Sequence, residues 1–144
     1  MFNRILVLCV GNICRSPTAE YILKQHITNK GTTVSSAGLA ALQGKPVDES
    51  AQKIALEHGV DMSPHIAQQV NSKMIYENDV ILVMQQAHLQ DLYARYPEAR
   101  GKVFLLGKWI DNAEISDPYR KSNEAFVHVY TLIERACHAW LKYL

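Results

Sequence analysis

The most informative stretch of this sequence is Cys9-Val10-Gly11-Asn12-Ile13-Cys14-Arg15-Ser16-Pro17. It continues the apolar run of residues 5–8, and a continuous apolar run is typical of a strand that is covered on both faces of a sheet. The pair Ser16-Pro17 predicts an N-cap followed by the first residue of a helix, which we expect to extend to about Thr28. Strand, tight turn and helix in this order indicate the start of an α/β fold.

The same alternation of strand and helix recurs along the chain. Further strands are predicted at residues 32–36, 80–84 and 103–106. Asp48 is a candidate cap for a helix that ends at Gly59, and a helix around Leu89 ends before Pro97. The last helix carries the clearest apolar stripe, at Phe126, Val129, Tyr130, Ile133, Cys137, Trp140, Leu141 and Leu144. We therefore expect one domain over residues 1–144, a three-layer α/β sandwich with a four-stranded parallel sheet and helices on both faces.

Composition excludes several classes of function. Apolar residues make up 48% of the 144 residues, and fifteen Lys and Arg stand against fourteen Asp and Glu. A net charge of +1 gives no reason to expect nucleic acid as a partner. No apolar run reaches the length of a membrane span, and the first one lacks a signal-peptide cleavage site, so we expect a cytoplasmic protein without membrane insertion.

The cysteines and histidines do not indicate a disulfide framework or a metal site. Three cysteines fit a reducing compartment better than a set of disulfides. No pair of Cys or His shows the close spacing of structural zinc ligands, so we expect neither a metal nor an organic cofactor. Cys137 lies on the apolar stripe and is predicted to be core. The remaining histidines are expected at the surface or partly buried: His26, His58, His88, His128 and His138.

The stretch after the first strand has the features of a cup for an oxyanion. Backbone N–H groups in a turn can converge on one point, and the following helix adds its positive end. The groups expected to bind phosphate belong to Val10, Gly11, Asn12, Ile13, Cys14 and Ser16, with Gly11 allowing a tight turn. Arg15 can hold two phosphate oxygens at once. The same surroundings favour a thiolate at Cys9, which would be the nucleophile.

A leaving alkoxide or phenolate also needs a proton donor. Because ligands bind outside the carboxyl ends of the strands, the candidates lie in the segments that follow those ends. Asp117, which precedes Pro118 and Tyr119 in the loop after the fourth strand, is the predicted general acid. Asp111 and Glu114 lie in the same loop and remain alternatives.

These motifs resemble those of the low-molecular-weight protein tyrosine phosphatases. The likeness rests on Cys-x5-Arg-Ser-Pro at residues 9–17 and Asp-Pro-Tyr at residues 117–119, and it extends to Ser36-Ala37-Gly38 and His65. Within the family, Gly101-Lys102-Val103 and residues 117–122 are most similar to the bacterial branch associated with capsule and exopolysaccharide export. The resemblance implies hydrolysis of phosphotyrosine in a protein, the expected partner being a bacterial tyrosine autokinase, by an enzyme that we expect to be monomeric.

The resemblance also implies roles for individual residues. Cys9 would carry a phosphocysteine intermediate, which water would hydrolyse with Asp117 acting as base. Ser16 would donate a hydrogen bond to the sulfur, and Asn12, Ser36 and His65 would support the loop. Ile13, Leu42 and Tyr119 would line a slot for an aromatic ring, and Cys14 could form a reversible disulfide with Cys9. Taken without the family, His65, Leu42 and Cys14 would be interpreted as packing residues.

The sequence departs from the family pattern at two positions. Gln68 and Gln85 stand where an arginine and an acidic residue are usual.

Three rival functions fit the sequence less well. A thiol-coupled arsenate reductase of the same fold would need further cysteines around residues 80–90, and the chain has none there. A phosphocysteine carrier would have to preserve its intermediate, which Arg15 and a general acid oppose. A nucleotide-binding loop would need a Gly-Lys-Ser/Thr ending, which is absent.

Overall fold

The computed structural model describes residues 2–144 and contains one parallel β-sheet. Its strands are β1 (Arg4–Cys9), β2 (Thr33–Gly38), β3 (Val80–Val83) and β4 (Val103–Leu105). They lie in the order β2-β1-β3-β4, and each neighbouring pair is parallel. Both the four-stranded parallel sheet and the predicted α/β class are thereby confirmed.

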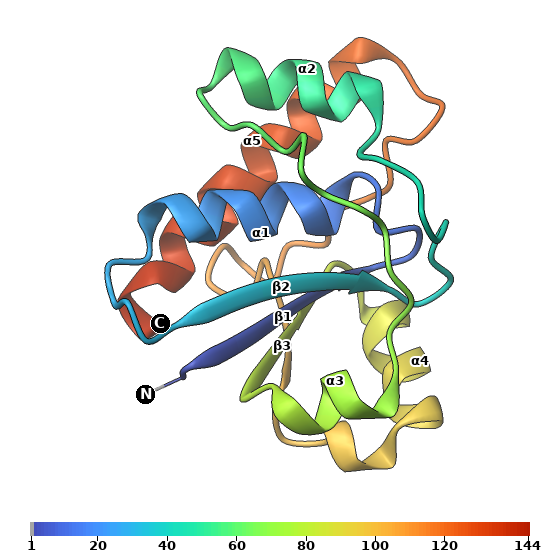
Figure 1. The fold of residues 1–144 in the computed structure, drawn as a ribbon, viewed down its shortest axis with the longest axis vertical. Coiled ribbons are helices and arrows are strands. Elements are labelled where there is room, and N and C mark those ends of the chain that lie inside the picture. The colour runs from blue at the N-terminus through green and yellow to red at the C-terminus, as the bar shows by residue number, and fades with distance from the viewer. Residues whose placement is uncertain (1) are drawn as a thin grey trace.

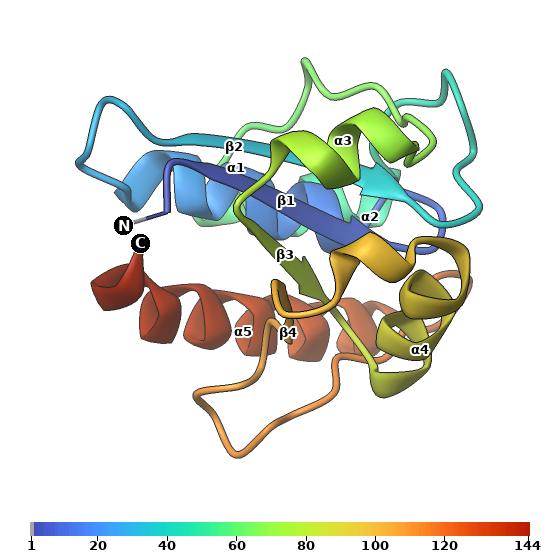
Figure 2. The ribbon, with the colours of Figure 1, turned by 90° about the horizontal axis from the view of Figure 1, so that it is seen from below.

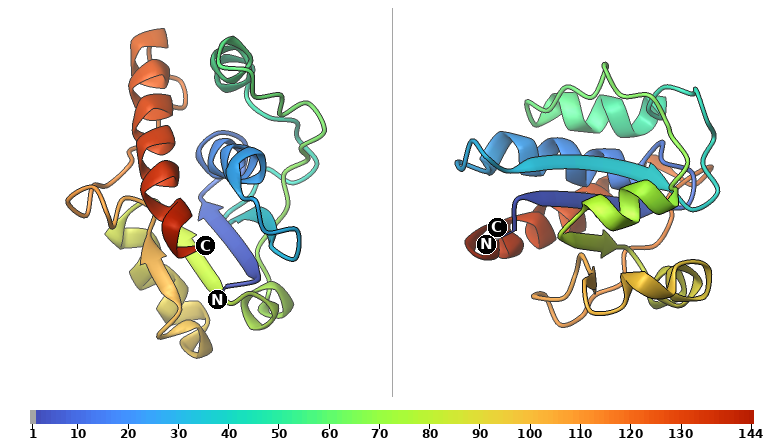
Figure 3. Two further views of the ribbon diagram at one scale, coloured as in Figure 1. Left: turned by 90° about the vertical axis from the view of Figure 1, so that its left-hand side faces the viewer. Right: turned by 60° about the horizontal axis from the view of Figure 1, so that its bottom comes forward.

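Helices cover both faces of the sheet (Figures 1 and 2). One face carries α1 (Arg15–His26), α2 (Glu49–Glu57) and α5 (Asn123–Trp140), with the 3-10 turn η2 (Leu141–Tyr143) at the end of α5. The other face carries α3 (Ser72–Glu77), α4 (Gln86–Arg95) and the 3-10 turn η1 (Pro97–Ala99). In the right-hand view of Figure 3, α2 lies farthest from the sheet, with α1 between them. The predicted three-layer sandwich is therefore the observed architecture.

The continuous apolar run of β1 is explained by burial on both sides. Ile5 and Val7 belong to the core beneath α1 and α5, whereas Leu6 and Leu8 belong to the core beneath α3 and α4. All four side chains are fully buried. A central strand between two helical layers has no polar face, so its sequence shows no alternation.

The C-terminal helix packs as its periodicity predicts. The stripe from Phe126 to Trp140 is buried against α1 and α2, and Cys137 is fully buried, which confirms its place in the core. Trp140 donates its indole N–H to the carbonyl of Leu106 at 2.8 Å. This bond ties the end of α5 to the residue that follows β4.

Of the two predicted helix caps, one is confirmed and the other is wrong. Asp48 caps α2, since its carboxylate accepts from the backbone N–H groups of Ser50 and Ala51. Ser16, however, lies inside α1, which begins at Arg15 with Cys14 in the cap position and no side-chain cap. The hydroxyl of Ser16 contacts Cys9 instead, so it serves the loop rather than the helix.

Candidate active site

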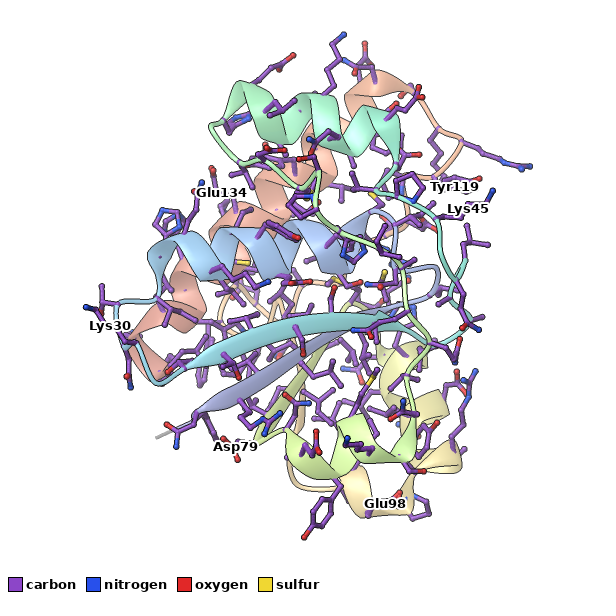
Figure 4. The ribbon with its side chains drawn as sticks, viewed as in Figure 1. Lys30, Lys45, Asp79, Glu98, Tyr119 and Glu134 are labelled. Carbon is purple, nitrogen blue, oxygen red and sulfur yellow. The ribbon has the colours of Figure 1, made fainter. Side chains whose placement is uncertain are left out.

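A pocket of about 160 Å³ lies beyond the carboxyl ends of the strands. Three segments far apart in the sequence form its walls: the β1–α1 loop (residues 10–14), residues 40–42 after β2, and the β4–α5 loop (residues 106–122). The lining residues are Cys9, Val10, Gly11, Ile13, Cys14, Arg15, Ala40, Leu42, Asp117 and Tyr119. In Figure 4, Tyr119 lies at the edge toward which β2 points, whereas Lys30 and Asp79 lie at the opposite edge. Of these ten, Ala40 is the one that no sequence motif indicates.

Cys9 ends β1 at the base of this pocket with 3% of its surface exposed. Its sulfur accepts a hydrogen bond from the backbone N–H of Asn12 at 3.3 Å and lies 2.9 Å from the hydroxyl oxygen of Ser16. Three backbone N–H groups of the loop have no hydrogen-bond acceptor among residues 2–144, namely those of Gly11, Ile13 and Cys14. These donors therefore remain available to an oxyanion above the sulfur.

The tight turn of the β1–α1 loop depends on Asn12 rather than on Gly11. Asn12 has a φ of 58°, in the left-handed region, whereas Gly11 has an ordinary φ. A Cβ at Gly11 would meet nothing closer than 3.7 Å. Gly11 therefore adopts no left-handed φ in this turn, and its expected close approach to the ligand stays a prediction. Asparagine tolerates this conformation better than most residues, and its side chain is held from three directions.

A buried polar network holds Asn12 in place. Its side-chain amide donates to the hydroxyls of Ser16 at 2.8 Å and Ser36 at 3.0 Å. The side-chain oxygen of Asn12 accepts from the backbone N–H of Gln68 at 2.9 Å, and its backbone carbonyl accepts from His65 Nε2 at 2.7 Å. Asn12, Ser36 and His65 thus lie together, as the resemblance implied.

Glu20 is a member of this network that the sequence did not reveal. Its carboxylate accepts a hydrogen bond from the Ser36 hydroxyl at 2.6 Å and lies 3.9 Å from His65 Nδ1. Lys24, one turn further along α1, pairs with the same carboxylate. Glu20 is only 6% exposed. The signal in the sequence that indicates this role is a charged residue among the buried positions of α1.

Gln68 supports the same loop through two bonds. Its backbone N–H binds Asn12, and its side-chain amide donates to the carbonyl of Ser36 at 2.9 Å. Close packing of β2 beside the loop also requires Gly38, because a Cβ there would lie 2.4 Å from the carbonyl oxygen of Val10. The end of β2 and the segment around Gln68 together brace the β1–α1 loop from outside.

Arg15 is buried, with 2% of its surface exposed, and its guanidinium is held by hydrogen bonds. Its Nη1 donates to Gln85 Oε1 at 2.9 Å and to the carbonyl of Ile115 at 2.8 Å. Its Nη2 lies 3.9 Å from Asp117 Oδ2. Gln85 thus occupies the position of the usual acidic residue and still orients the guanidinium, but through a neutral partner.

The three acidic residues of the β4–α5 loop differ in what they contact. Asp117 lines the pocket, with its side chain about half exposed, and Oδ1 accepts from the backbone N–H of Tyr119 at 3.0 Å. Glu114 accepts from the backbone N–H of Gln86 at 2.6 Å, and Asp111 is exposed with a φ of 60°. Neither Glu114 nor Asp111 lines the pocket.

Burial shifts the pKa of two groups near the site. Burial raises the pKa of the Cys14 thiol well above its usual range, and the neighbouring Cys9 adds to this effect. Burial, with a smaller contribution from Arg15, lowers the pKa of His88 to about 4. His88 is 6% exposed, which contradicts the expectation that it lies at the surface or is only partly buried. Cys14 is therefore a neutral thiol and His88 a neutral imidazole near pH 7.

No metal cluster accompanies these groups. Across residues 2–144, His, Cys, Asp and Glu nowhere gather in threes that could hold an ion. The cysteines Cys9, Cys14 and Cys137 are all free thiols. Within the same residues, no helix has the length and apolar character needed to cross a membrane.

Comparison with known sequences identifies the family. The family described as low molecular weight phosphotyrosine protein phosphatase matches residues 4–144. The chain belongs to this family. The resemblance seen in the motifs and the expected enzyme class, protein-tyrosine-phosphatase, are thereby confirmed.

Individual relatives cover the full length of the chain. Wzb, a low molecular weight protein-tyrosine-phosphatase of Salmonella typhimurium, is 49% identical over 144 residues, which span 100% of this chain and 95% of the relative. The probable low molecular weight protein-tyrosine-phosphatase AmsI of Erwinia amylovora is 47% identical, and the match spans 100% of this chain and 99% of the relative. The structure of Vibrio vulnificus Wzb with benzylphosphonate matches with a TM-score of 0.95 at 51% identity over 100% of both chains. These names confirm the expected likeness to the capsule and exopolysaccharide branch.

Proposed function

We propose that residues 1–144 form a single phosphatase domain that hydrolyses phosphotyrosine in proteins through a phosphocysteine on Cys9. The observation that supports this most directly is the meeting of Cys9, Arg15 and Asp117 around one pocket. Each comes from a different element, and together they supply a nucleophile, an anion clamp and a proton donor.

The first step transfers the phosphoryl group to the enzyme. The phosphate binds over Cys9, where backbone N–H groups of Val10, Gly11, Ile13, Cys14 and Ser16 and the guanidinium of Arg15 bind its oxygens, whereas the Asn12 N–H bonds to the sulfur. The thiolate attacks phosphorus in line, so that the S–P bond forms as the bond from phosphorus to the tyrosine oxygen breaks. Asp117 donates its proton to the leaving phenolate.

The second step returns the enzyme to its starting state. Asp117, now ionised, removes a proton from water as the water attacks phosphorus, and the S–P bond breaks. The electron pair returns to the sulfur of Cys9. Ser16 stabilises this thiolate, since its hydroxyl lies 2.9 Å from the sulfur.

The pocket walls favour an aromatic substrate. Ile13, Leu42 and Tyr119 line the opening together with Ala40, and Leu42 and Tyr119 are 43% and 37% exposed. Apolar walls suit the two faces of a phenyl ring. Phosphoserine lacks a ring to fill this slot, and its phosphate would reach Cys9 less easily from the surface of a protein.

The relatives support a partner and a location. Because the chain aligns over its full length with phosphatases named Wzb and AmsI, we assign as its substrate a tyrosine autokinase of capsule or exopolysaccharide export. Such a kinase would present its phosphotyrosines in the cytoplasm, where a monomeric phosphatase could reach them.

The rival chemistry of arsenate reduction is less well supported. It needs a second and third thiol to carry a disulfide outward from Cys9. Cys137 is fully buried, and its thiol faces the carbonyl of Ala19 at 3.8 Å, so it cannot take part without unfolding of the core. Residues 80–90 contain no cysteine.

The test is hydrolysis of matched phosphotyrosine and phosphoserine peptides by purified protein in the presence of EDTA. We expect strong turnover of phosphotyrosine, little of phosphoserine and no dependence on added metal. The Cys9→Ser variant should bind vanadate without turnover. Absence of turnover on both peptides by the unaltered enzyme would overturn the proposal and direct attention to arsenate or to a phosphocysteine carrier.

A further inference from the structure

Helix α4 begins beside the pocket without a cap of its own. Gln85 stands in the N-cap position with extended backbone angles, yet its side chain makes no capping bond. That side chain instead accepts from Arg15 Nη1 at 2.9 Å. The first turn of α4 also contains no acidic residue. The positive end of α4 is therefore left to a partner from elsewhere in the chain.

Glu114 of the β4–α5 loop is that partner. Its Oε2 accepts from the backbone N–H of Gln86, the first residue of α4, at 2.6 Å. A carboxylate at this position has both a charge-assisted hydrogen bond and a favourable interaction with the helix dipole. The cap that α4 lacks locally is thus supplied across 28 residues of sequence.

The next residue completes the attachment of the loop. Ile115 donates its N–H to the carbonyl of Met84 at 3.0 Å, and its own carbonyl accepts from Arg15 at 2.8 Å. Within residues 116–118, the one backbone–backbone hydrogen bond among the described residues is local: the carbonyl of Pro118 accepts from the N–H of Lys121 at 2.9 Å. Asp117 stands two residues beyond Ile115, so residues 114–115 are the last fixed points before its carboxylate.

We propose that Glu114 is a positioning residue for the general acid. Because Glu114 caps α4, it attaches the β4–α5 loop to the N-terminus of α4, where Gln85 orients Arg15. This attachment fixes the distance from Asp117 to the leaving-group oxygen. This inference rests on the proposed function, in which Asp117 protonates the phenolate. It assigns Glu114 no contact with the substrate.

The test measures the first chemical step with two leaving groups. Burst-phase release is recorded for phosphotyrosine, whose phenolate needs a proton, and for p-nitrophenyl phosphate, whose leaving group needs little help. Four variants are compared: Glu114→Ala, Glu114→Gln, Asp117→Asn and the double variant Glu114→Ala with Asp117→Asn. Asp111→Asn is the matched control, since Asp111 lies in the same loop, has a left-handed φ that asparagine accepts, and makes no hydrogen bond or ion pair to α4 among residues 2–144.

We expect Glu114→Ala to slow phosphotyrosine release roughly three- to tenfold, the effect of losing one charged cap. Release from p-nitrophenyl phosphate should change less than twofold, and Glu114→Gln, which keeps an acceptor oxygen, should recover part of the loss. In the Asp117→Asn background the further change Glu114→Ala should have no additional effect on either substrate. Asp111→Asn should match the unaltered enzyme.

Two results would overturn the inference while leaving the proposed function intact. In the first, Asp117→Asn slows release from phosphotyrosine more than release from p-nitrophenyl phosphate, but the Glu114 variants slow both substrates equally. The other is a Glu114→Ala loss that persists in the Asp117→Asn background. If Asp117→Asn itself fails to discriminate, the assignment of the acid in the proposed function fails, and the inference fails with it. Glu114→Gln keeps the test valid should Glu114→Ala not fold.

Discussion

The hydroxyl oxygen of Ser16 lies 2.9 Å from the sulfur of Cys9. Both groups are buried, and the same hydroxyl accepts from the side-chain amide of Asn12 at 2.8 Å. The Ser16 hydroxyl can donate either to this sulfur or to the carbonyl of Ala37, which lies farther away at 3.5 Å, so the shorter contact favours donation to the sulfur. A serine that the Ser-Pro pattern assigns to a helix cap thus contacts the sulfur of the proposed nucleophile.

Replacing Ser16 with alanine should slow turnover without the stability loss of a missing cap. A hydrogen bond to a charged group contributes ~1.5–3 kcal/mol, so kcat should fall by roughly ten- to a hundredfold, with the phosphoenzyme accumulating. Steady-state and burst kinetics measure both quantities.

Ser122→Ala is the matched control for Ser16→Ala. Ser122 is a true N-cap, accepting from the backbone N–H of Ala125 at 3.2 Å. Its loss should lower the free energy of unfolding by ~1 kcal/mol and leave kcat unchanged. The opposite pattern, an active but destabilised Ser16→Ala, would show that Ser16 is a helix residue only.

Asn12 can be tested by a pair of substitutions that separate its conformation from its side chain. Asn12→Gly keeps a residue that accepts a φ of 58°, whereas Asn12→Ala adds the strain of a left-handed Cβ. Both should weaken vanadate binding, because the network to Ser36 and Gln68 is lost. The alanine variant should be less stable than the glycine variant by ~1 kcal/mol, measured by urea unfolding. Equal stability of the two would contradict the strained conformation.

His88 should make stability depend on pH. Its pKa is lowered to about 4 in the folded protein, against about 6.5 in the unfolded chain. Between these values the unfolded state binds more protons, so stability is fullest above pH 6.5 and falls as the pH drops toward 4. Relative to His88→Gln, the unaltered protein should lose roughly 1–3 kcal/mol of unfolding free energy over this range. Parallel curves for the two proteins would refute a neutral buried imidazole.

Gln85 offers a test of how the guanidinium is tuned. In Gln85→Glu the hydrogen bond to Arg15 can persist, but a negative charge would lie beside the cation and offset it. Inorganic phosphate should therefore inhibit the variant more weakly, with a dissociation constant raised roughly threefold or more by the added like charge. Isothermal titration with phosphate measures this directly, and unchanged or tighter binding would contradict the account.

Much of the fold could be predicted because burial leaves a strong signal in the sequence. The runs that form β1 and β3 are apolar since both faces of the sheet are covered, and the stripe of α5 follows helical spacing. The short helix α3 was not predicted. It has six residues, only Ile75 is buried, and its Asn71 cap acts through one bond to Met74, so no periodicity marks it.

The supporting residues of the site were harder to predict than its reactive ones. Cys9, Arg15 and Asp117 belong to motifs with a chemical rationale, and the structure brings them to one pocket. Glu20 and Gln85 act only through other side chains, and their partners are 16 and 70 residues away. Such pairings depend on the tertiary fold, which local patterns do not record.

The central step of the proposed mechanism is the transfer of phosphate to the sulfur of Cys9. The direct test mixes phosphotyrosine peptide bearing labelled phosphate with the Asp117→Asn variant, quenches in acid within one turnover, and maps the label by mass spectrometry. We predict stoichiometric phosphate on the sulfur of Cys9, and no phosphate at residue 9 in Cys9→Ala. Turnover without label on Cys9, or label in the Cys9→Ser variant at any position other than residue 9, would contradict the proposed mechanism.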